Sequence, residues 1–408
     1  MLQNTLRKNL ILLVLILAGE SIFFLPFVLV RIFRPVFLRV FELSNLELGA
    51  CFSVYGVVAM VAYFFGGPLA DRFSSRNLMS VALWATGLGG IYLSFLPDLW
   101  ALRWLYGFWG LTTILLFWAA MIRATRDWGG AAHQGKAFGW LEGGRGLTAA
   151  LLGTLALSIF SSESDATGVS VFQQVIRITS AVTLAVGGLV WFAVPSQAAE
   201  SKEATPKASF SHVLDLVRRP TVWLQAGIIV CAYVGYKITD DLSLYAHEVL
   251  HFNEVKASAV GTAAIWMRPV FALFAGLLAD RLSGGKVLSA CFACTVFGGA
   301  GLALGIPGNL AWLALITMAL ALAGIYGLRG VYFAVMGEGK IPTYATGTAV
   351  GIMSVVGYTP DVFMSPLMGW ILDSYPGPVG HQGVFGVLVV FGLLGLLLSL
   401  LFLRKTLK

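Results

Sequence analysis

The chain of 408 residues contains little charge. Asp, Glu, Lys and Arg make up 12% of it, about half the fraction in a typical soluble domain. Hydrophobic residues account for 58%, and the mean hydropathy is +0.83. These values exclude a soluble globular fold and predict an integral membrane protein.

Several chemical signatures are also missing. The sequence has no zinc-ligand spacing, no glycine-rich phosphate loop and no patch in which basic and aromatic residues alternate. We therefore expect no cofactor, no metal, no nucleic-acid partner and no ATP-driven or enzymatic chemistry. The four cysteines lie within apolar segments, and Cys291 and Cys294 are better explained by packing than by a redox or metal site.

Apolar runs of about 20 residues dominate the chain, and each is long enough to cross a bilayer as a helix. The first run is longer than the apolar core of a signal peptide and lacks a small-x-small cleavage site, so we expect it to be retained. The sequence predicts an all-α membrane protein with twelve transmembrane helices. The runs cover 10–33, 46–66, 77–96, 100–122, 137–160, 171–194, 222–246, 256–279, 287–306, 310–335, 347–371 and 383–403.

One break in composition divides the runs into two sets of six. Residues 196–220 are rich in Ala, Ser, Glu and Lys, and they end in a segment, 210–219, with the pattern of a short amphipathic helix on the membrane surface. The predicted domains are therefore an N-terminal six-helix bundle (1–195), a cytoplasmic linker (196–220) and a C-terminal six-helix bundle (221–408).

Loop charge predicts the orientation of the chain. Lys and Arg concentrate at the N-terminus, in alternate loops, in the linker and in the tail, and the opposite loops are nearly free of them. By the positive-inside rule both termini are cytoplasmic, in a bacterial-type inner membrane. The first outer loop, which would contain Arg34 and Arg39, is the exception.

A turn sequence occurs twice, about half the chain apart. Gly67-Pro-Leu-Ala-Asp71-Arg72 and Gly276-Leu-Leu-Ala-Asp280-Arg281 each end an apolar run and precede a short turn rich in Ser and Gly. The positive-inside rule does not place an acid beside an arginine in both copies. A repeat of this length indicates two related halves, as in many transporters.

The repeated turn resembles the loop signature of the major facilitator superfamily. Arg103-Trp-Leu-Tyr-Gly107 resembles the second signature of that superfamily. The resemblance implies two pseudo-symmetric six-helix bundles that move around a central site by alternating access. Helices 1, 4, 7 and 10 would then line the cavity, and helices 2, 5, 8 and 11 would flank it.

A narrower resemblance links the chain to the organophosphate:phosphate antiporter branch. The segments that carry it are Tyr233-Val-Gly-Tyr236-Lys237, Ile325-Tyr-Gly327 and Gly347-Thr-Ala-Val-Gly351. That branch grips phosphate with one cation on the first helix and one on the seventh. Here the resemblance implies Lys237 on the seventh helix and either Arg31 or Arg34 on the first.

Charged residues inside the runs need an explanation, because each costs roughly 2.5–3.5 kcal/mol at the bilayer centre. The candidate substrate-binding residues are Arg31, Lys237, Tyr236, Arg145, Arg268 and Arg329, and the candidate proton-coupling acids are Glu20, Glu142, Asp240, Asp241 and Asp361. Arg177 lies near the outer end of its run, where it can reach the interface, so we assign it no function.

Spacing along a helix predicts two ion pairs, Glu142 with Arg145 and Lys237 with Asp241. Either pair can be structural, lowering the cost of insertion, or functional. Arg268 precedes Pro269 and can serve a freed carbonyl, and Glu20 can bind a neighbouring helix.

The repeated turns have a different predicted role, which is to hold the cytoplasmic side shut in one state. Asp71 and Asp280 can cap neighbouring helix N-termini or pair with basic residues nearby. The candidate gating residues are Asp71, Arg72, Arg76, Arg103, Asp280 and Arg281.

The sequence thus predicts a monomeric secondary transporter for a small, anionic organic solute such as an organophosphate or a carboxylate. Arg31 and Lys237 precede their repeated aspartates by similar distances, so two cations could converge on one anion. Protons or a second anion would supply the energy. A multidrug or metabolite exporter and a permease-like ligand sensor are the alternatives.

Overall fold

The computed structural model describes residues 2–130, 134–162, 168–196, 216–306, 310–333, 335, 338–339 and 346–406. Within these residues every regular element is a helix. Ten of the described helices are long and apolar enough to cross a membrane. The helix α4 (Ser75–Leu93) and the pair α15 (Thr346–Gly357) and α16 (Pro360–Ser374) account for the other two predicted spans. The predicted all-α fold with twelve spans is confirmed.

The spans follow one another along the chain. The first six are α1 (Leu2–Phe23) with η1 (Phe24–Val28) and α2 (Leu29–Val40), then α3 (Asn45–Arg72), α4, α5 (Leu99–Gly110) with η2 (Leu111–Trp118) and α6 (Ala119–Gly129), α7 (Gln134–Ser162) and α8 (Val169–Ala193). The last six are α10 (Pro220–Ile238) with η3 (Thr239–Asp241) and α11 (Leu242–Glu248), then α12 (Glu254–Arg281), α13 (Gly284–Ala303), α14 (Ala311–Val331), the pair α15 and α16, and α17 (Pro378–Thr406).

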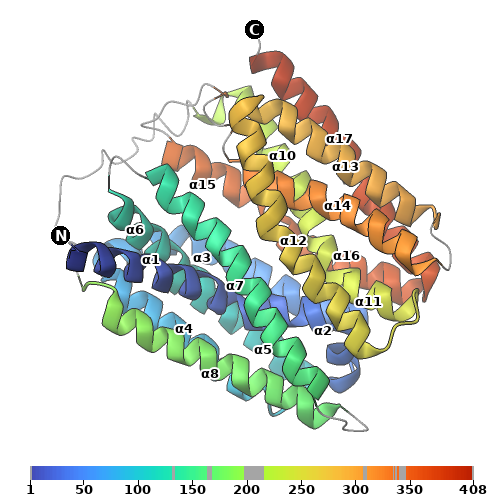
Figure 1. The fold of residues 1–408 in the computed structure, drawn as a ribbon, viewed down its shortest axis with the longest axis horizontal. Helices are drawn as coiled ribbons and strands as arrows, with labels where there is room; N and C mark the ends of the chain where they lie inside the picture. Colours follow the sequence, from blue (N-terminus) through green and yellow to red (C-terminus); the bar gives the residue numbers. More distant parts are fainter. Residues whose placement is uncertain are drawn as a thin grey trace. The chain divides into compact units, whose positions relative to one another are not determined.

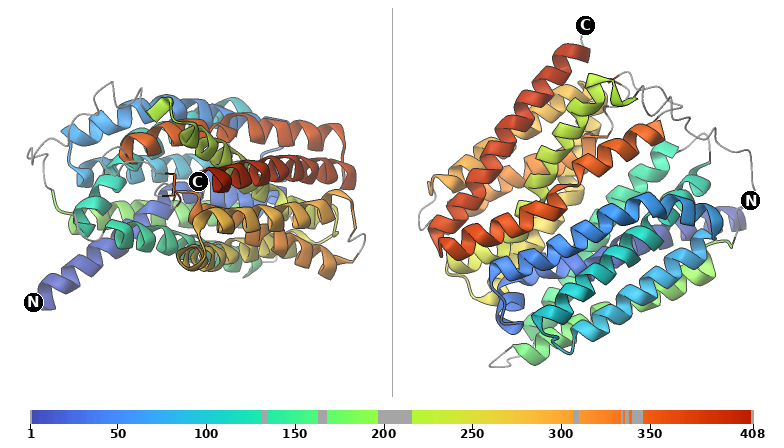
Figure 2. Two further views of the ribbon diagram at one scale, coloured as in Figure 1. Left: turned by 90° about the horizontal axis from the view of Figure 1, so that it is seen from above. Right: turned by 180° about the vertical axis from the view of Figure 1, so that it is seen from behind.

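The chain divides into two compact units. Unit 1 comprises Met1–Lys202 and Phe252–Trp266, and unit 2 comprises Glu203–His251 and Met267–Lys408. In unit 1, α4 packs along α8, α3 along α5 and α1 along α7 (Figure 1). In unit 2, α13 packs against both α14 and α17, and α10 packs against α15 and α17 (Figure 2).

Local signals in the sequence explain where several helices begin. Ser44 and Glu47 form a reciprocal capping box at the start of α3, with N···O distances of 3.2 and 2.9 Å. The Asp98 carboxylate accepts the amide of Ala101 at 2.8 Å at the start of α5. These caps bind amides that would otherwise lack partners at the membrane boundary.

The first span is longer than predicted. Helical structure continues through α2 to Val40, so Arg34 and Arg39 lie in the helix and not in an outer loop, which corrects the sequence interpretation. Pro26 lies in the π-helical turn η1, and the residue Phe33 has non-helical backbone angles two positions before Pro35. Proline removes a backbone donor and so accounts for both irregularities without ending the span.

The eleventh span is divided, whereas the sequence predicted one continuous run over 347–371. Its two helices meet at Tyr358 and Thr359, and Pro360 opens α16. Thr359 before it keeps right-handed helical angles, and proline is favoured in the first turn of a helix, where its missing N–H is not needed. The division places Asp361 in the first turn of α16.

Side-chain packing in each unit combines large and very small residues. Trp109, Tyr106 and Phe52 are buried in the core of unit 1, and ring contacts join them. In unit 2 a Cβ atom at Gly298 would overlap the backbone of Ala321, so α13 and α14 approach through this glycine.

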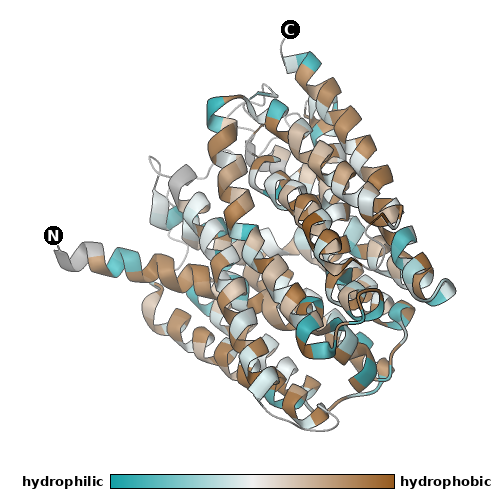
Figure 3. Ribbon diagram, turned by 45° about the vertical axis from the view of Figure 1, so that its right-hand side comes forward, coloured by the Kyte–Doolittle hydropathy of each residue, from teal (hydrophilic) through white to brown (hydrophobic). Residues whose placement is uncertain are grey.

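Large apolar side chains cover the outside of the helices. Phe192 is 88% exposed and Phe297 is 71% exposed. Hydrophobic residues line the helices along most of their length, and hydrophilic residues gather at helix ends (Figure 3). This distribution is the one expected of a surface in contact with lipid. The predicted amphipathic helix lies largely outside the described residues, which resume at Leu216.

Candidate functional site

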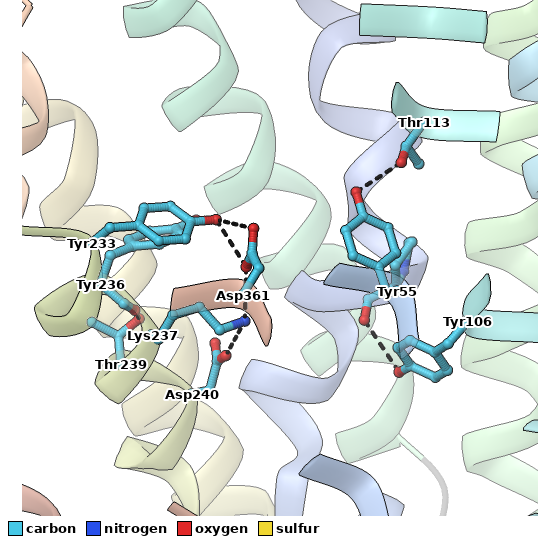
Figure 4. Close-up of polar contacts among 10 residues, drawn as sticks. Tyr55, Tyr106, Thr113, Tyr233, Tyr236, Lys237, Thr239, Asp240 and Asp361 are labelled. Carbon is cyan, nitrogen blue, oxygen red and sulfur yellow. Dashed lines mark hydrogen bonds and ion pairs between the residues drawn. The ribbon is translucent and has the colours of Figure 1, made fainter. Parts of the chain in front are cut away.

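A buried cluster of charge lies in unit 2, where the seventh and eleventh spans meet. The ammonium of Lys237 on α10 lies 3.3 Å from a carboxylate oxygen of Asp240 on η3 and 3.6 Å from one of Asp361 on α16 (Figure 4). The Lys237 side chain is 2% exposed and that of Asp240 is 3% exposed. One cation is thus held between two acids inside a membrane span.

Tyrosines surround this cluster. The Tyr233 hydroxyl donates to both carboxylate oxygens of Asp361, at 3.1 and 3.0 Å (Figure 4). The guanidinium of Arg329 on α14 lies 3.9 Å from the centre of the Tyr236 ring and 5.8 Å from that of Tyr233. An arginine over an aromatic face keeps its charge at lower cost than one facing hydrocarbon. The predicted residues Lys237, Tyr236 and Arg329 therefore belong to one group.

A second cluster lies in unit 1, where the first and fifth spans meet. The guanidinium of Arg145 on α7 lies 2.6 Å from Glu142 on the same helix and 3.3 Å from Glu20 on α1. Arg145 also donates to the carbonyl of Gly19 at 2.9 Å, and its guanidinium lies 5.5 Å from the centre of the Phe23 ring. The predicted pairing of Glu142 with Arg145 is confirmed.

The two clusters share one plan. In each unit a cation binds one acid three positions away on its own span and a second acid on another span. The spans are the first and fifth in unit 1 and the seventh and eleventh in unit 2, which are equivalent positions in a chain built from two related halves. Each of these cations thus has two acids beside it, and in unit 2 the guanidinium of Arg329 over the Tyr236 ring adds a second base to the group.

The predicted pairing of Lys237 with Asp241 is wrong. The η3 turn is a 3₁₀ helix, and it brings Asp240 to the ammonium in place of Asp241. Asp241 contacts His381 on α17 at 2.8 Å, and the other ring nitrogen of His381 lies 3.0 Å from Glu248 on α11. Sequence reasoning missed His381, whose only signal was its position at the start of an apolar run.

The remaining candidate cations are buried. Arg31 and Arg34 are each 3% exposed and Arg268 is 6% exposed. Arg34 donates to the side chain of Asn45 at 2.9 Å, which supports a structural role at the start of α3. Arg39 forms a two-pronged contact with Glu254, at 2.7 and 2.8 Å. The role of Arg31 as a cavity cation on the first span remains a prediction.

The repeated turns share one feature, a serine that caps the helix after the turn. Ser74 caps α4 by accepting the Asn77 amide at 3.3 Å, and Ser283 caps α13 by accepting the Lys286 amide at 3.4 Å. In the second copy the Glu338 carboxylate also accepts the amides of Gly284 and Gly285, at 2.6 and 3.1 Å.

The suggestion that Asp71 and Asp280 cap these helices is therefore wrong. Both aspartates are exposed, and neither forms a hydrogen bond or ion pair with any residue that the structure describes. Of the basic gating candidates, Arg76 lies over the Trp191 ring at 4.8 Å. The gating roles of Asp71, Arg72, Arg76, Arg103, Asp280 and Arg281 remain predictions.

Charged clusters inside apolar spans are typical of the pathways by which solutes and ions cross membranes. The profile of the Major Facilitator Superfamily matches residues 10–360, so the chain belongs to that superfamily. Two relatives from Escherichia coli (strain K12) match over almost their whole length. Inner membrane protein YqcE is 30% identical, with 96% of this chain and 95% of that protein covered. Inner membrane protein YihN is 26% identical, with coverage of 98% and 96%.

Solved structures share the fold. The D-xylose–proton symporter aligns with a TM-score of 0.74 at 16% identity, covering 97% of this chain and 96% of that one. The nucleoside transporter NupG aligns with a TM-score of 0.73 at 13% identity, covering 98% and 100%. A bacterial homologue of the human lysosomal transporter Spinster aligns with a TM-score of 0.72 at 15% identity, covering 97% of both chains. Because the chain belongs to the Major Facilitator Superfamily, the protein is a multi-pass membrane transporter and not an enzyme.

Proposed function

We propose that this transporter moves a small organic anion, of the organophosphate or carboxylate type, by secondary active transport across the inner membrane. The observation that supports this most is the contact of Lys237 with both Asp240 and Asp361 in the interior of unit 2. With two acids beside one lysine, one acid can give up its contact while the lysine keeps the other. Each charge inside a membrane span costs roughly 2.5–3.5 kcal/mol on insertion scales, so this group of charges needs an explanation.

The charge balance of this cluster supports proton coupling. Lys237 and Arg329 carry two positive charges, and Asp240 and Asp361 carry two negative charges when ionised. Protonation of Asp361 leaves the group with one net positive charge. It also removes one carboxylate from the ammonium, and an anionic solute can take its place. Proton and anion then bind together, which is the requirement for symport.

Asp361 suits the role of proton acceptor for a geometric reason. Its side chain is 16% exposed, whereas that of Asp240 is 3% exposed, so water reaches Asp361 more readily. The Tyr233 hydroxyl holds its carboxylate in place. Exchange for a second anion remains the other mode of coupling, since a competing anion could displace the carboxylate in the same way.

Unit 1 supplies a second set of proposed binding residues. Arg145 with Glu20 and Glu142 repeats the arrangement of one base with two acids. Arg31 is the proposed partner of Lys237 in gripping the anion from the N-terminal half. Arg268 is a further candidate in the C-terminal half. The division into bundles at 1–195 and 221–408, a monomeric state and cytoplasmic termini complete the proposal.

Binding and transport test the proposal in two steps. A thermal-shift screen of the purified protein against sugar phosphates, carboxylates, nucleosides and cationic drugs identifies the ligand class. Uptake of the best ligand into proteoliposomes, with and without a pH gradient, then measures coupling. We expect Lys237→Ala to abolish uptake and Lys237→Arg to retain part of it, because charge is kept while geometry changes.

The variant Asp361→Asn separates the two modes of coupling. It should keep exchange of one anion for another and lose accumulation driven by a pH gradient. Arg177→Ala is the matched control, because Arg177 is a cation within a span whose guanidinium contacts Ser94 and not an acid cluster. Stabilisation by cationic drugs alone would favour an exporter, and retained binding without uptake would favour a sensor.

A further inference from the structure

A buried histidine joins two acids at the end of unit 2 that loop charge predicts to be periplasmic. His381 is in the first turn of α17, and its ring lies between Asp241, at the end of η3, and Glu248, at the end of α11. The distances are 2.8 Å from Nδ1 to Asp241 and 3.0 Å from Nε2 to Glu248. The Tyr245 ring lies nearly perpendicular to the imidazole, with 5.6 Å between ring centres.

The exposed fraction of the side chain falls from Glu248 through His381 to Asp241. The side chain of Glu248 is 35% exposed, that of His381 is 1% exposed and that of Asp241 is fully buried. The second carboxylate oxygen of Asp241, Oδ1, is also buried and has no hydrogen-bond partner among the described residues. The groups thus form a path from a solvent-accessible acid to an enclosed one.

Proton counting shows that the cluster holds one exchangeable proton. Each ring nitrogen of His381 is within hydrogen-bond distance of a carboxylate oxygen, and each such contact needs a hydrogen. A neutral imidazole carries only one N–H. The second hydrogen must therefore be on the ring, as an imidazolium, or on one of the two carboxyl groups.

We propose that His381 relays protons between Glu248 and Asp241. In the inward step the Glu248 carboxyl gives its proton to Nε2 while the Nδ1–H proton moves to the Asp241 carboxylate. One N–H bond forms and one breaks, and the ring is neutral before and after. The imidazole returns to its first tautomer when a proton passes back or when the ring rotates.

The relay, which rests on the proposed function for its purpose, would deliver protons beside the Lys237 cluster. Asp241 follows Asp240 directly on η3, and Asp240 contacts the Lys237 ammonium. A proton on Asp241 removes a negative charge next to that ion pair. Loading of Asp241 would therefore alter the charge that Lys237 experiences before Asp361 is protonated.

The test measures proton transfer in the full-length protein without any solute. A photo-released proton lowers the pH of purified protein, and time-resolved infrared spectroscopy follows the C=O stretch of protonated carboxyl groups. The Asp241 band is the one lost in Asp241→Asn. We expect His381→Gln, whose amide still donates a hydrogen bond but cannot pass a proton, to slow the rise of that band at least tenfold. Glu248→Gln should slow it similarly.

The matched control is His247→Gln, on the same helix as Glu248, which should leave the rate unchanged. An unchanged rate in His381→Gln would overturn the relay, and so would a wild-type protein in which Asp241 never takes up a proton. If His381→Gln does not fold, the rate in Glu248→Gln decides the matter. Because no solute is used, transport of a neutral solute would refute the anion proposal and leave the relay standing.

Discussion

Removal of the Lys237 ammonium is the sharpest perturbation that the structure suggests. Lys237→Ala leaves the carboxylates of Asp240 and Asp361 facing each other within a span, with the charge that joined them gone. Breaking a buried ion pair by removing one partner costs about 3–5 kcal/mol in folded proteins. We expect a loss of about 3 kcal/mol, because the 16% exposed Asp361 can take up a proton and relieve part of the repulsion.

A second substitution turns this loss into a test of the cluster itself. Asp361→Asn in the Lys237→Ala background removes the surplus negative charge and keeps a group that Tyr233 can hydrogen-bond. We expect the double variant to regain more than half of the lost stability, so the coupling energy of the cycle should exceed about 1.5 kcal/mol. Charge alone sets the sign of the coupling energy. Asp361→Asn should lower stability in the wild-type protein, where Asp361 contacts Lys237, and should raise it in Lys237→Ala, where that partner is gone.

Unfolding in mixed detergent and SDS micelles, followed by tryptophan fluorescence, measures these differences. Lys405→Ala is the control, because Lys405 is an exposed cation in the last turn of α17 and should change stability by less than about 0.5 kcal/mol. The reasoning fails if Lys237→Ala costs no more than this control. It also fails if Asp361→Asn is equally harmful with and without the lysine.

Three further predictions concern the turns and the topology. Asp71→Asn should impair transport but keep ligand affinity within a few-fold of wild type by calorimetry, and Asp280→Asn should be milder because its turn has a glycine where the first has a second arginine. Glu338→Gln should lower stability by about 1–3 kcal/mol in the same unfolding assay, because the carboxylate binds two amides at the start of α13. A cysteine at the 60% exposed Val379 should react with a membrane-impermeant label from the periplasm, and one at Arg404 only from the cytoplasm. Labelling of Arg404→Cys from outside would reverse the orientation.

Sequence reasoning predicted the spans well because each is a local property. A run of apolar residues near 20 long must form its own hydrogen bonds in lipid, so composition alone locates the helices. Errors arose at prolines. Pro35 did not end the first span, because a helix can tolerate proline where neighbouring groups serve the freed backbone. Pro360, in contrast, divided the eleventh span. The sequence around the two prolines did not predict which of them would interrupt its helix.

The site was less predictable, because ion pairing depends on contacts between spans. A spacing of three residues correctly predicted the pair of Glu142 and Arg145. A spacing of four predicted that Lys237 pairs with Asp241, whereas the structure pairs it with Asp240. A regular α-helix would favour neither acid clearly, and the local 3₁₀ turn decided between them. Contacts of Asp361 with Lys237 and of His381 with Asp241 join segments more than 120 residues apart. Residue spacing in a single sequence does not predict such contacts between distant segments.

The matched clusters in the two units suggest why the repeat survives beneath divergent side chains. In unit 1 the cation and its nearest acid are on the fifth span, and in unit 2 they are on the seventh, so the base has moved between partner helices while two acids remain beside it. Unit 2 differs in one respect, because Arg329 over the Tyr236 ring adds a second base to its group. Protonation of one acid then leaves the unit 2 group with one net positive charge, and a solute with one negative charge is the class of ligand that this group would neutralise.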